Sequence, residues 1–107
     1  MASCWIDLGQ EHLLSFTRWA PDRRLNPQYA HLPDVERYGA IIRHFRDLGN
    51  ICTSAITFDG PVQRELATEH SFWTVETWEP LTLTPSLLCQ CGDHGWIREG
   101  CWVPVAA

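Results

Sequence analysis

The residue types best suited to chemistry gather near the C-terminus. Cys89, Cys91 and His94 place two thiols and one imidazole within six residues, and Gly92 directly follows the second cysteine. Zinc in proteins takes four such ligands in a tetrahedron, and a tight turn can present several of them at once. A glycine behind a ligand cysteine allows a positive φ, so that amide N–H groups can point at the sulfur. The spacing therefore predicts a metal site that holds zinc.

The fourth ligand is expected from the segment that follows. Residues 96–103 have the form of a hairpin with glycine in its turn, which returns Cys101 toward the same end of the sheet. Cys101 is therefore the most economical fourth ligand, and His70 and Cys52 are the reserves. The alternative hypothesis is that the cysteines are small buried hydrophobic residues and that His94 is a hydrogen-bonded turn residue.

A catalytic interpretation of the same region is the second hypothesis. Ser86 stands eight residues before His94, and a serine activated by a histidine is the minimal nucleophile pair, usually oriented by a carboxylate. Asp93, Glu76 or Glu79 could supply that carboxylate. However, no Gly-x-Ser-x-Gly elbow is present, and a Thr-Pro-Ser segment commonly starts a turn. A redox pair of the two cysteines is less favoured, because no helix N-terminus or cationic neighbour is evident to lower a thiol pKa.

The composition limits the class of protein. The 107 residues fit a single domain over 1–107, and 45% hydrophobic with 20% charged residues is typical of a folded chain. The net charge of −5 and the absence of lysine argue against a nucleic-acid interface or an anionic membrane surface. No apolar run approaches the ~18 residues of a membrane helix, and the start lacks the features of a signal peptide. We therefore expect a cytoplasmic protein, in a reducing compartment where close-spaced cysteines favour metal over disulfides.

An α+β fold is expected to position these residues. Residues 34–48 predict the main amphipathic helix, with Asp34 as N-cap, Gly49 in a left-handed stop and one apolar stripe made of Val35, Tyr38, Ile41, Ile42, Phe45 and Leu48. Residues 51–58 predict a strand, and residues 62–70 a short helix that opens at Pro61. From residue 71 onward the pattern is β-rich. We expect the helix to pack on a small, mostly antiparallel sheet, with the C-terminal hairpin next to the Cys/His cluster.

An ordered signature runs through residues 72–103. It comprises a strand end, a cysteine shortly before a histidine, and an aromatic hairpin, here Leu83-Thr84-Pro85-Ser86, Cys89 and Cys91, His94, and Trp96-Ile97-Arg98-Glu99-Gly100 with Trp102. This signature resembles that of an uncharacterised family of small phage and bacterial proteins. Some bacterial members have a further cysteine-rich run in the N-terminal half, so the resemblance implies a metal site completed from two segments. This chain lacks that run and offers Cys52 there, which would pass the fourth position to Cys101.

The function expected from these observations is binding rather than catalysis. The resemblance to accessory phage genes, and to genes near ubiquitin-like conjugation operons, implies a phage-encoded accessory protein that binds a host or phage protein in the host cell cytoplasm. Zinc would stabilise it. The alternative is a small hydrolase or peptidase-like enzyme that uses the Cys/His metal site or the pair Ser86 and His94. A structural metal has four protein ligands, whereas a catalytic metal leaves one position open to water.

Overall fold

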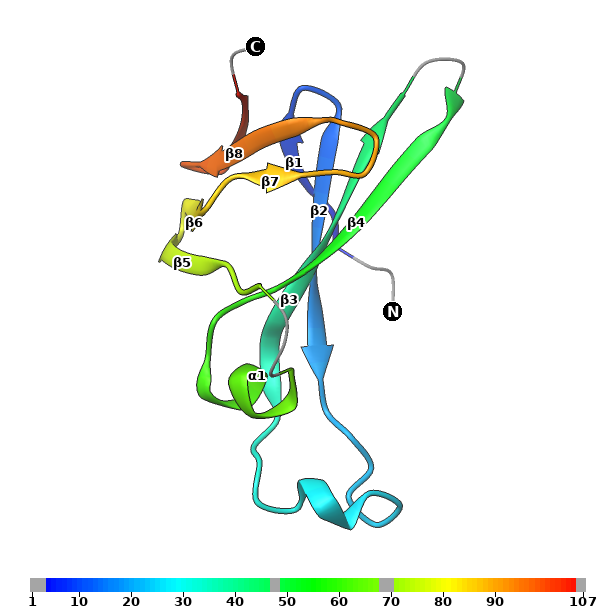
Figure 1. The fold of residues 1–107 in the computed structure, drawn as a ribbon, viewed down its shortest axis with the longest axis vertical. Coiled ribbons are helices and arrows are strands. Elements are labelled where there is room, and N and C mark those ends of the chain that lie inside the picture. Colours follow the sequence, from blue (N-terminus) through cyan, green and yellow to red (C-terminus); the bar gives the residue numbers. More distant parts are fainter. Residues whose placement is uncertain (1–3, 47–48, 68–70, 106–107) are drawn as a thin grey trace.

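The computed structural model describes residues 4–46, 49–67 and 71–105, which form three antiparallel sheets (Figure 1). The largest sheet has four strands in the order in which they occur along the chain: β1 (Ile6–Gly9), β2 (His12–Trp19), β3 (Val35–Phe45) and β4 (Ile51–Thr57). The second sheet pairs β5 (Thr74–Trp78) with β6 (Leu81–Thr84). The third contains β7 (Leu87–Leu88), β8 (His94–Arg98) and β9 (Cys101–Pro104).

The prediction of a main helix over residues 34–48 is wrong, and with it the α+β fold class. Residues 35–45 form β3, the longest strand of the structure, and the described helical elements are the 3-10 turn η1 (Pro27–Tyr29) and the short helix α1 (Pro61–Leu66). Five of the eleven residues of β3 are valine, isoleucine, tyrosine or phenylalanine. These types favour strands, although the same residues also form the apolar stripe of the predicted helix. The fold is therefore mostly antiparallel β.

Pairing on both sides decides the conformation of β3. The strand pairs with β2 and with β4, and this buries Ala40, Ile42 and His44 on one face. Gly39 suits this arrangement, because a Cβ at this position would stand 2.1 Å from the carbonyl oxygen of Ile56 on β4. In a helix the same glycine would cost about 1 kcal/mol relative to alanine.

The register of the large sheet sets the geometry of one of its ends. His12 on β2 lies opposite His44 on β3, and His44 in turn lies opposite Cys52 on β4. Residues that are directly opposite in an antiparallel pair project from the same face of the sheet. Two imidazoles and a thiol therefore form a row across three strands.

The small sheets cover the face from which this row projects. In Figure 1, β7 and β8 cross the upper part of the long β2–β3–β4 ribbon, and the turn between them reaches toward β4. The shared core contains buried apolar residues from both layers, namely Leu8, Leu14, Ala40, Ile42, Ile56, Phe58, Leu81, Leu83, Leu87, Ile97 and Trp102. Each large apolar side chain contributes roughly 1.5–3 kcal/mol when fully buried. This core fixes the β7–β8 turn above the row of imidazoles and thiol.

The β8–β9 hairpin confirms the prediction made for residues 96–103. Arg98 pairs with Cys101, and the two residues between them, Glu99 and Gly100, have φ values of 50° and 76°. Two left-handed residues are what a type I′ turn requires.

Among the described residues, no helix is long and apolar enough to cross a membrane.

Candidate metal centre

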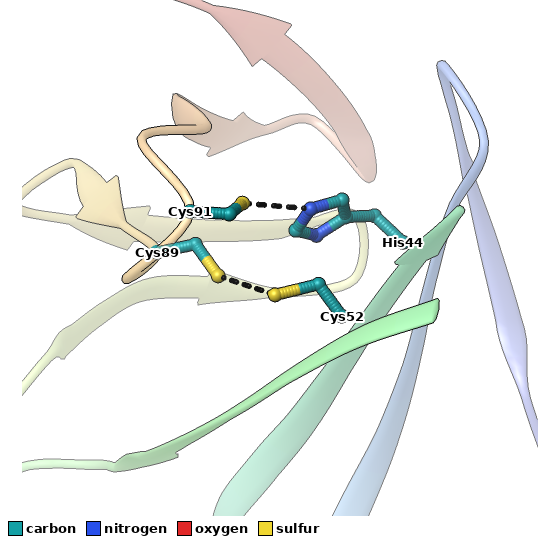
Figure 2. Close-up of side chains that lie close together, drawn as sticks. All are labelled: His44, Cys52, Cys89 and Cys91. Atoms are coloured by element: carbon teal, nitrogen blue, oxygen red, sulfur yellow. Dashed lines mark hydrogen bonds between the residues drawn. The ribbon is translucent and has the colours of Figure 1, made fainter. Parts of the chain in front are cut away.

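Four side chains from three segments meet at one end of the large sheet: His44 on β3, Cys52 on β4, and Cys89 and Cys91 in the β7–β8 turn (Figure 2). The ligand atoms of all four lie within 4.8 Å of one another. His44 Nε2 is 3.2 Å from the Sγ of Cys91, and the Sγ atoms of Cys52 and Cys89 are 3.1 Å apart. Zn–S bonds of about 2.3 Å in a tetrahedron separate the ligand atoms by roughly 3.8 Å. The observed spacing therefore suits one tetrahedral ion.

The β7–β8 turn presents its two thiols toward the sheet through local hydrogen bonds. The amide of Cys89 donates to the carbonyl oxygen of Asp93 at 2.8 Å, and the amide of Gly92 donates to the carbonyl of Cys89 at 2.9 Å. Gly92 has a φ of 96°, which confirms that a left-handed residue follows the second cysteine. A residue with a Cβ would be strained there. Glycine thus lets a short turn direct two sulfur atoms at one point.

Two of the thiols at this site, those of Cys52 and Cys89, have pKa values shifted in opposite directions. Burial opposes ionisation of Cys89, but hydrogen bonds from the Cys91 amide, the Ser54 hydroxyl and the Cys52 thiol outweigh it and lower its pKa to about 7. The pKa of Cys52 is raised to about 11, because its thiol is held in the hydrogen bond to Cys89 and is partly desolvated. Cys89 therefore ionises more readily than Cys52, and a metal must displace the proton that Cys52 still holds near neutral pH.

His44 is held in a form that can bind a metal through Nε2. It is 6% exposed, and burial lowers its pKa even though the Asp93 carboxylate favours the charged form. The Oδ2 atom of Asp93 lies 3.7 Å from His44 Nδ1. A carboxylate at the second nitrogen of a metal-binding histidine fixes the tautomer and orients the ring. Asp93 is therefore placed to support the metal ligand rather than to be one.

Asp93 is itself held by His12. Its Oδ2 lies 2.6 Å from His12 Nε2, while His12 Nδ1 lies 2.6 Å from the carbonyl oxygen of Gln10. Both partners are hydrogen-bond acceptors, so the His12 ring is fixed between the Asp93 carboxylate and the Gln10 carbonyl. His12 also stacks on Trp102, with ring centroids 4.1 Å apart. Although His12, His44 and Asp93 are close enough to hold an ion of their own, the bond between His12 and Asp93 occupies the atoms that such an ion would need.

The structure separates the ligands predicted from the sequence into two places. Cys89 and Cys91 belong to the group of four, and Cys52, named as a reserve, joins them. His94 instead lies with its Nε2 atom 2.8 Å from the hydroxyl of Ser86. Cys101 begins β9 and is exposed. The other reserve, His70, falls outside the described residues.

His44 was missed because residues 34–48 were interpreted as a helix. On a helix His44 has no relation to Cys52, whereas on a hairpin the two residues stand opposite each other. The strand predicted over residues 51–58 was the available signal. If the segment before the turn at Gly49 is also a strand, antiparallel pairing of the two places His44 beside Cys52. The strand propensity of the segment, rather than its apolar stripe, would have revealed the ligand.

The proposed nucleophile pair is close together but lacks an orienting group. Ser86 and His94 are in hydrogen-bonding contact. Of the carboxylates suggested for the third position, Asp93 binds His12, and Glu76 accepts a hydrogen bond from Thr84. Within the part of the chain that the structure describes, no carboxylate contacts the other nitrogen of His94. The pair is therefore a dyad without its third member.

One imidazole and three thiols form a ligand set that only the tertiary structure assembles, since its members span residues 44 to 91. The set is typical of closed zinc sites. Comparison with known proteins returned no match among family models, curated proteins or solved structures.

Proposed function

We propose that this protein is a zinc-stabilised binding module that acts on another protein and not on a substrate. One Zn²⁺ held by His44, Cys52, Cys89 and Cys91 would fix the β7–β8 turn against the β3–β4 hairpin. The convergence of four ligand atoms within 4.8 Å is the observation that carries the proposal. Three soft thiolates and one imidazole favour zinc over the hard cations Mg²⁺ and Ca²⁺, which prefer oxygen. Such thiols stay available for metal in a reducing compartment such as the cytoplasm.

The surroundings of the site favour a structural metal over a catalytic one. Four protein ligands complete a tetrahedron and leave no position for water. The cavity beside Cys89 has a volume of about 80 Å³ and is lined mainly by apolar side chains, among them Ile42, Ile56, Trp73, Leu87 and Trp102. A tetrahedron closed by four protein ligands next to an apolar cavity supports folding rather than turnover.

A metal at this position would contribute a large share of the stability. It links His44 to Cys91, which are 47 residues apart in the sequence. The loop-closure estimate for a cross-link of that span is about 4 kcal/mol. The total stability of a domain is only about 5–15 kcal/mol. Without the metal, only about 1–11 kcal/mol of that stability would remain.

Exposed apolar residues near the metal end support a partner-binding role. Phe45 and Ile51 are opposite each other at the end of the β3–β4 hairpin and are 44% and 51% exposed. Leu88, next to the ligand Cys89, is 68% exposed. An exposed pair of neighbouring apolar residues such as Phe45 and Ile51 is the kind of surface feature that interaction sites use. The resemblance of residues 72–103 to accessory phage proteins supports a host or phage protein as the partner.

The test is elemental analysis of protein purified without added zinc, with single cysteine variants. We expect one zinc per chain in the wild type and in Cys101→Ser, and its loss together with a lower thermal midpoint in Cys52→Ser and Cys91→Ser. Cys101→Ser is the matched control because that thiol is exposed and outside the group. A metal-free wild type would contradict the proposal. Zinc retained by Cys52→Ser but lost from Cys101→Ser would contradict this ligand set.

The contact between Ser86 and His94 favours a second candidate, a small serine hydrolase. A fluorophosphonate probe labels an activated serine, and Ser86→Ala is the control. Labelling at Ser86 that disappears in this variant would establish the hydrolase. We rank it second because the dyad lacks a carboxylate.

A further inference from the structure

The outer edge of β4 is unpaired next to the metal centre. β4 is the last strand of the large sheet, and among the described residues it pairs with β3 only. At its end, the Trp73 amide donates to the Thr57 carbonyl at 2.9 Å, and the Asp59 amide donates to the Trp73 carbonyl at 2.8 Å. Backbone groups alternate in direction along a strand. The N–H and C=O groups of Ala55 and Thr53 therefore point outward as well, and no strand of the described residues pairs with them there.

A groove follows this unpaired edge. One hollow of about 300 Å³ is lined by residues 52–55 of β4 with Leu88, Cys89 and Gln90. A second hollow of about 360 Å³ is lined by Ala55, Thr57, Ser71 and Trp73. The two hollows share Ala55 and so lie next to each other along β4. Apart from the two thiols Cys52 and Cys89, which belong to the metal centre, the lining residues are uncharged, so the occupant should present mainly uncharged side chains.

The two edges of the large sheet differ in their protection. Proteins usually protect a free edge with lysine, proline, a bulge or a covering segment. β1 is four residues long, has an irregular register against β2 and is contacted by β9. β4 has seven residues, none of them charged or proline, and keeps an unbroken register against β3 from Thr57 to Ile51. β4 thus has the features of an edge strand that can pair with a strand from another protein.

We propose that an extended, uncharged segment of a partner protein adds to β4 as a fifth strand, along Ile51–Ala55. Strand addition is the way in which the proposed binding module would hold its partner, so this inference rests on the proposed function. The unpaired N–H and C=O groups recur every second residue, and only another extended backbone can satisfy them all. The chain already uses the lower end of the same edge, where Trp73 forms a parallel bridge with Phe58. The guest strand would continue that pairing toward the metal.

A second copy of the chain is a poorer occupant than a single extended segment. Leu88 and Trp73 line the groove. A second β4 edge would bring its own copies of these side chains to the same place and crowd the groove from both sides. A lone strand brings only its alternating side chains.

The groove and the metal centre share two residues. Cys52 and Cys89 both line the upper hollow and both belong to the group of four. A metal that joins them would hold the segment from Leu88 to Gln90 against β4. Removal of the metal should therefore weaken the binding of a guest strand.

The test uses 12-residue peptides selected from a random displayed library on the zinc-loaded full chain. Backbone amide exchange, measured by NMR with and without a selected peptide, reports which edge is occupied. We expect exchange of the Thr53 and Ala55 amides to slow at least tenfold, with no change for the amides of β1.

Two variants check the assignment. Leu88→Asp places a charge in the groove at an exposed position and should weaken the peptide at least tenfold, while Leu88→Met should bind as the wild type does.

Thr53→Pro removes one outward N–H and no hydrogen bond to β3, so it should weaken the peptide at least tenfold while zinc content is unchanged. Thr53→Val is its control. The inference is overturned if no peptide is recovered, if bound peptides protect other amides, or if Leu88→Asp binds normally. Protection of Thr53 and Ala55 that rises with protein concentration alone would overturn it in favour of a second copy.

Zinc content measured on the same samples separates the two proposals. Zinc-loaded protein that accepts no strand contradicts the strand addition alone. Wild-type protein that contains no zinc as purified but still accepts the peptide along Thr53 and Ala55 supports strand addition and contradicts the zinc proposal.

Discussion

The sulfur atoms of Cys52 and Cys89 lie 3.1 Å apart although 37 residues separate them in the sequence. This contact joins the edge strand of the large sheet to the turn of the small one. The two thiols are also unequal, since the pKa of Cys89 is about 7 and that of Cys52 about 11. A pair of this kind can hold a metal together or, without it, form a disulfide with each other.

Metal-free protein should therefore form a Cys52–Cys89 disulfide on treatment with hydrogen peroxide. The Cys89 thiolate would attack the peroxide, giving a sulfenic acid and hydroxide, and the Cys52 thiol would then displace water to form the S–S bond. Peptide mapping by mass spectrometry should find this crosslink, at a mass about 2 Da below that of the reduced pair. Zinc-loaded protein should resist, and Cys101→Ser should behave as the wild type. A crosslink that involves Cys101 would contradict the geometry.

Zinc binding should release fewer protons at pH 8 than at pH 6. Above a pKa of about 7 the Cys89 thiol has already lost its proton, whereas Cys52, with a pKa of about 11, still carries one at both pH values. Proton competition therefore falls as the pH rises, and zinc affinity increases. Isothermal titration in two buffers with different ionisation enthalpies measures the number of protons. An equal number at both pH values would show that Cys89 is not the acidic thiol.

Asp93→Asn should weaken zinc binding 10–100-fold without removing a ligand. The carboxylate faces Nδ1 of His44 at 3.7 Å and orients the ring whose Nε2 points at Cys91. Competition with a chromophoric chelator measures the affinity. Asp59→Asn is a suitable control because that carboxylate pairs with Arg64 on the surface. Unchanged affinity in Asp93→Asn would leave Asp93 as a partner of His12 alone.

Gly95→Ala should lower the free energy of unfolding by about 1–3 kcal/mol, the range for overpacking a core. A Cβ at residue 95 would stand 2.4 Å from the indole ring of Trp102, which is buried and stacks on His12. Val103→Ala, at an exposed position on β9, should cost less than 1 kcal/mol. Denaturant titration compares the two. A fully stable Gly95→Ala variant would mean that Trp102 can move without loss.

Local patterns were sufficient for the turns and for two of the four residues that could hold a metal, Cys89 and Cys91. The β8–β9 hairpin and the helix that begins at Pro61 follow from glycine, proline and the residues beside them, because a turn or cap depends on its own few residues. For the same reason the sequence of the β7–β8 turn placed Cys89 and Cys91 together.

The helix predicted over residues 34–48 failed because its apolar residues fit two periods. Val35, Ile41 and Phe45 can line a helix or a strand, and only pairing with β2 and β4 selects the strand. The other two members of the group of four depend on that choice, since His44 and Cys52 come together only through strand register. The sequence by itself thus determined that one turn presents the thiols of Cys89 and Cys91 together. The tertiary structure decided what they face, because register joins residues that are distant along the chain.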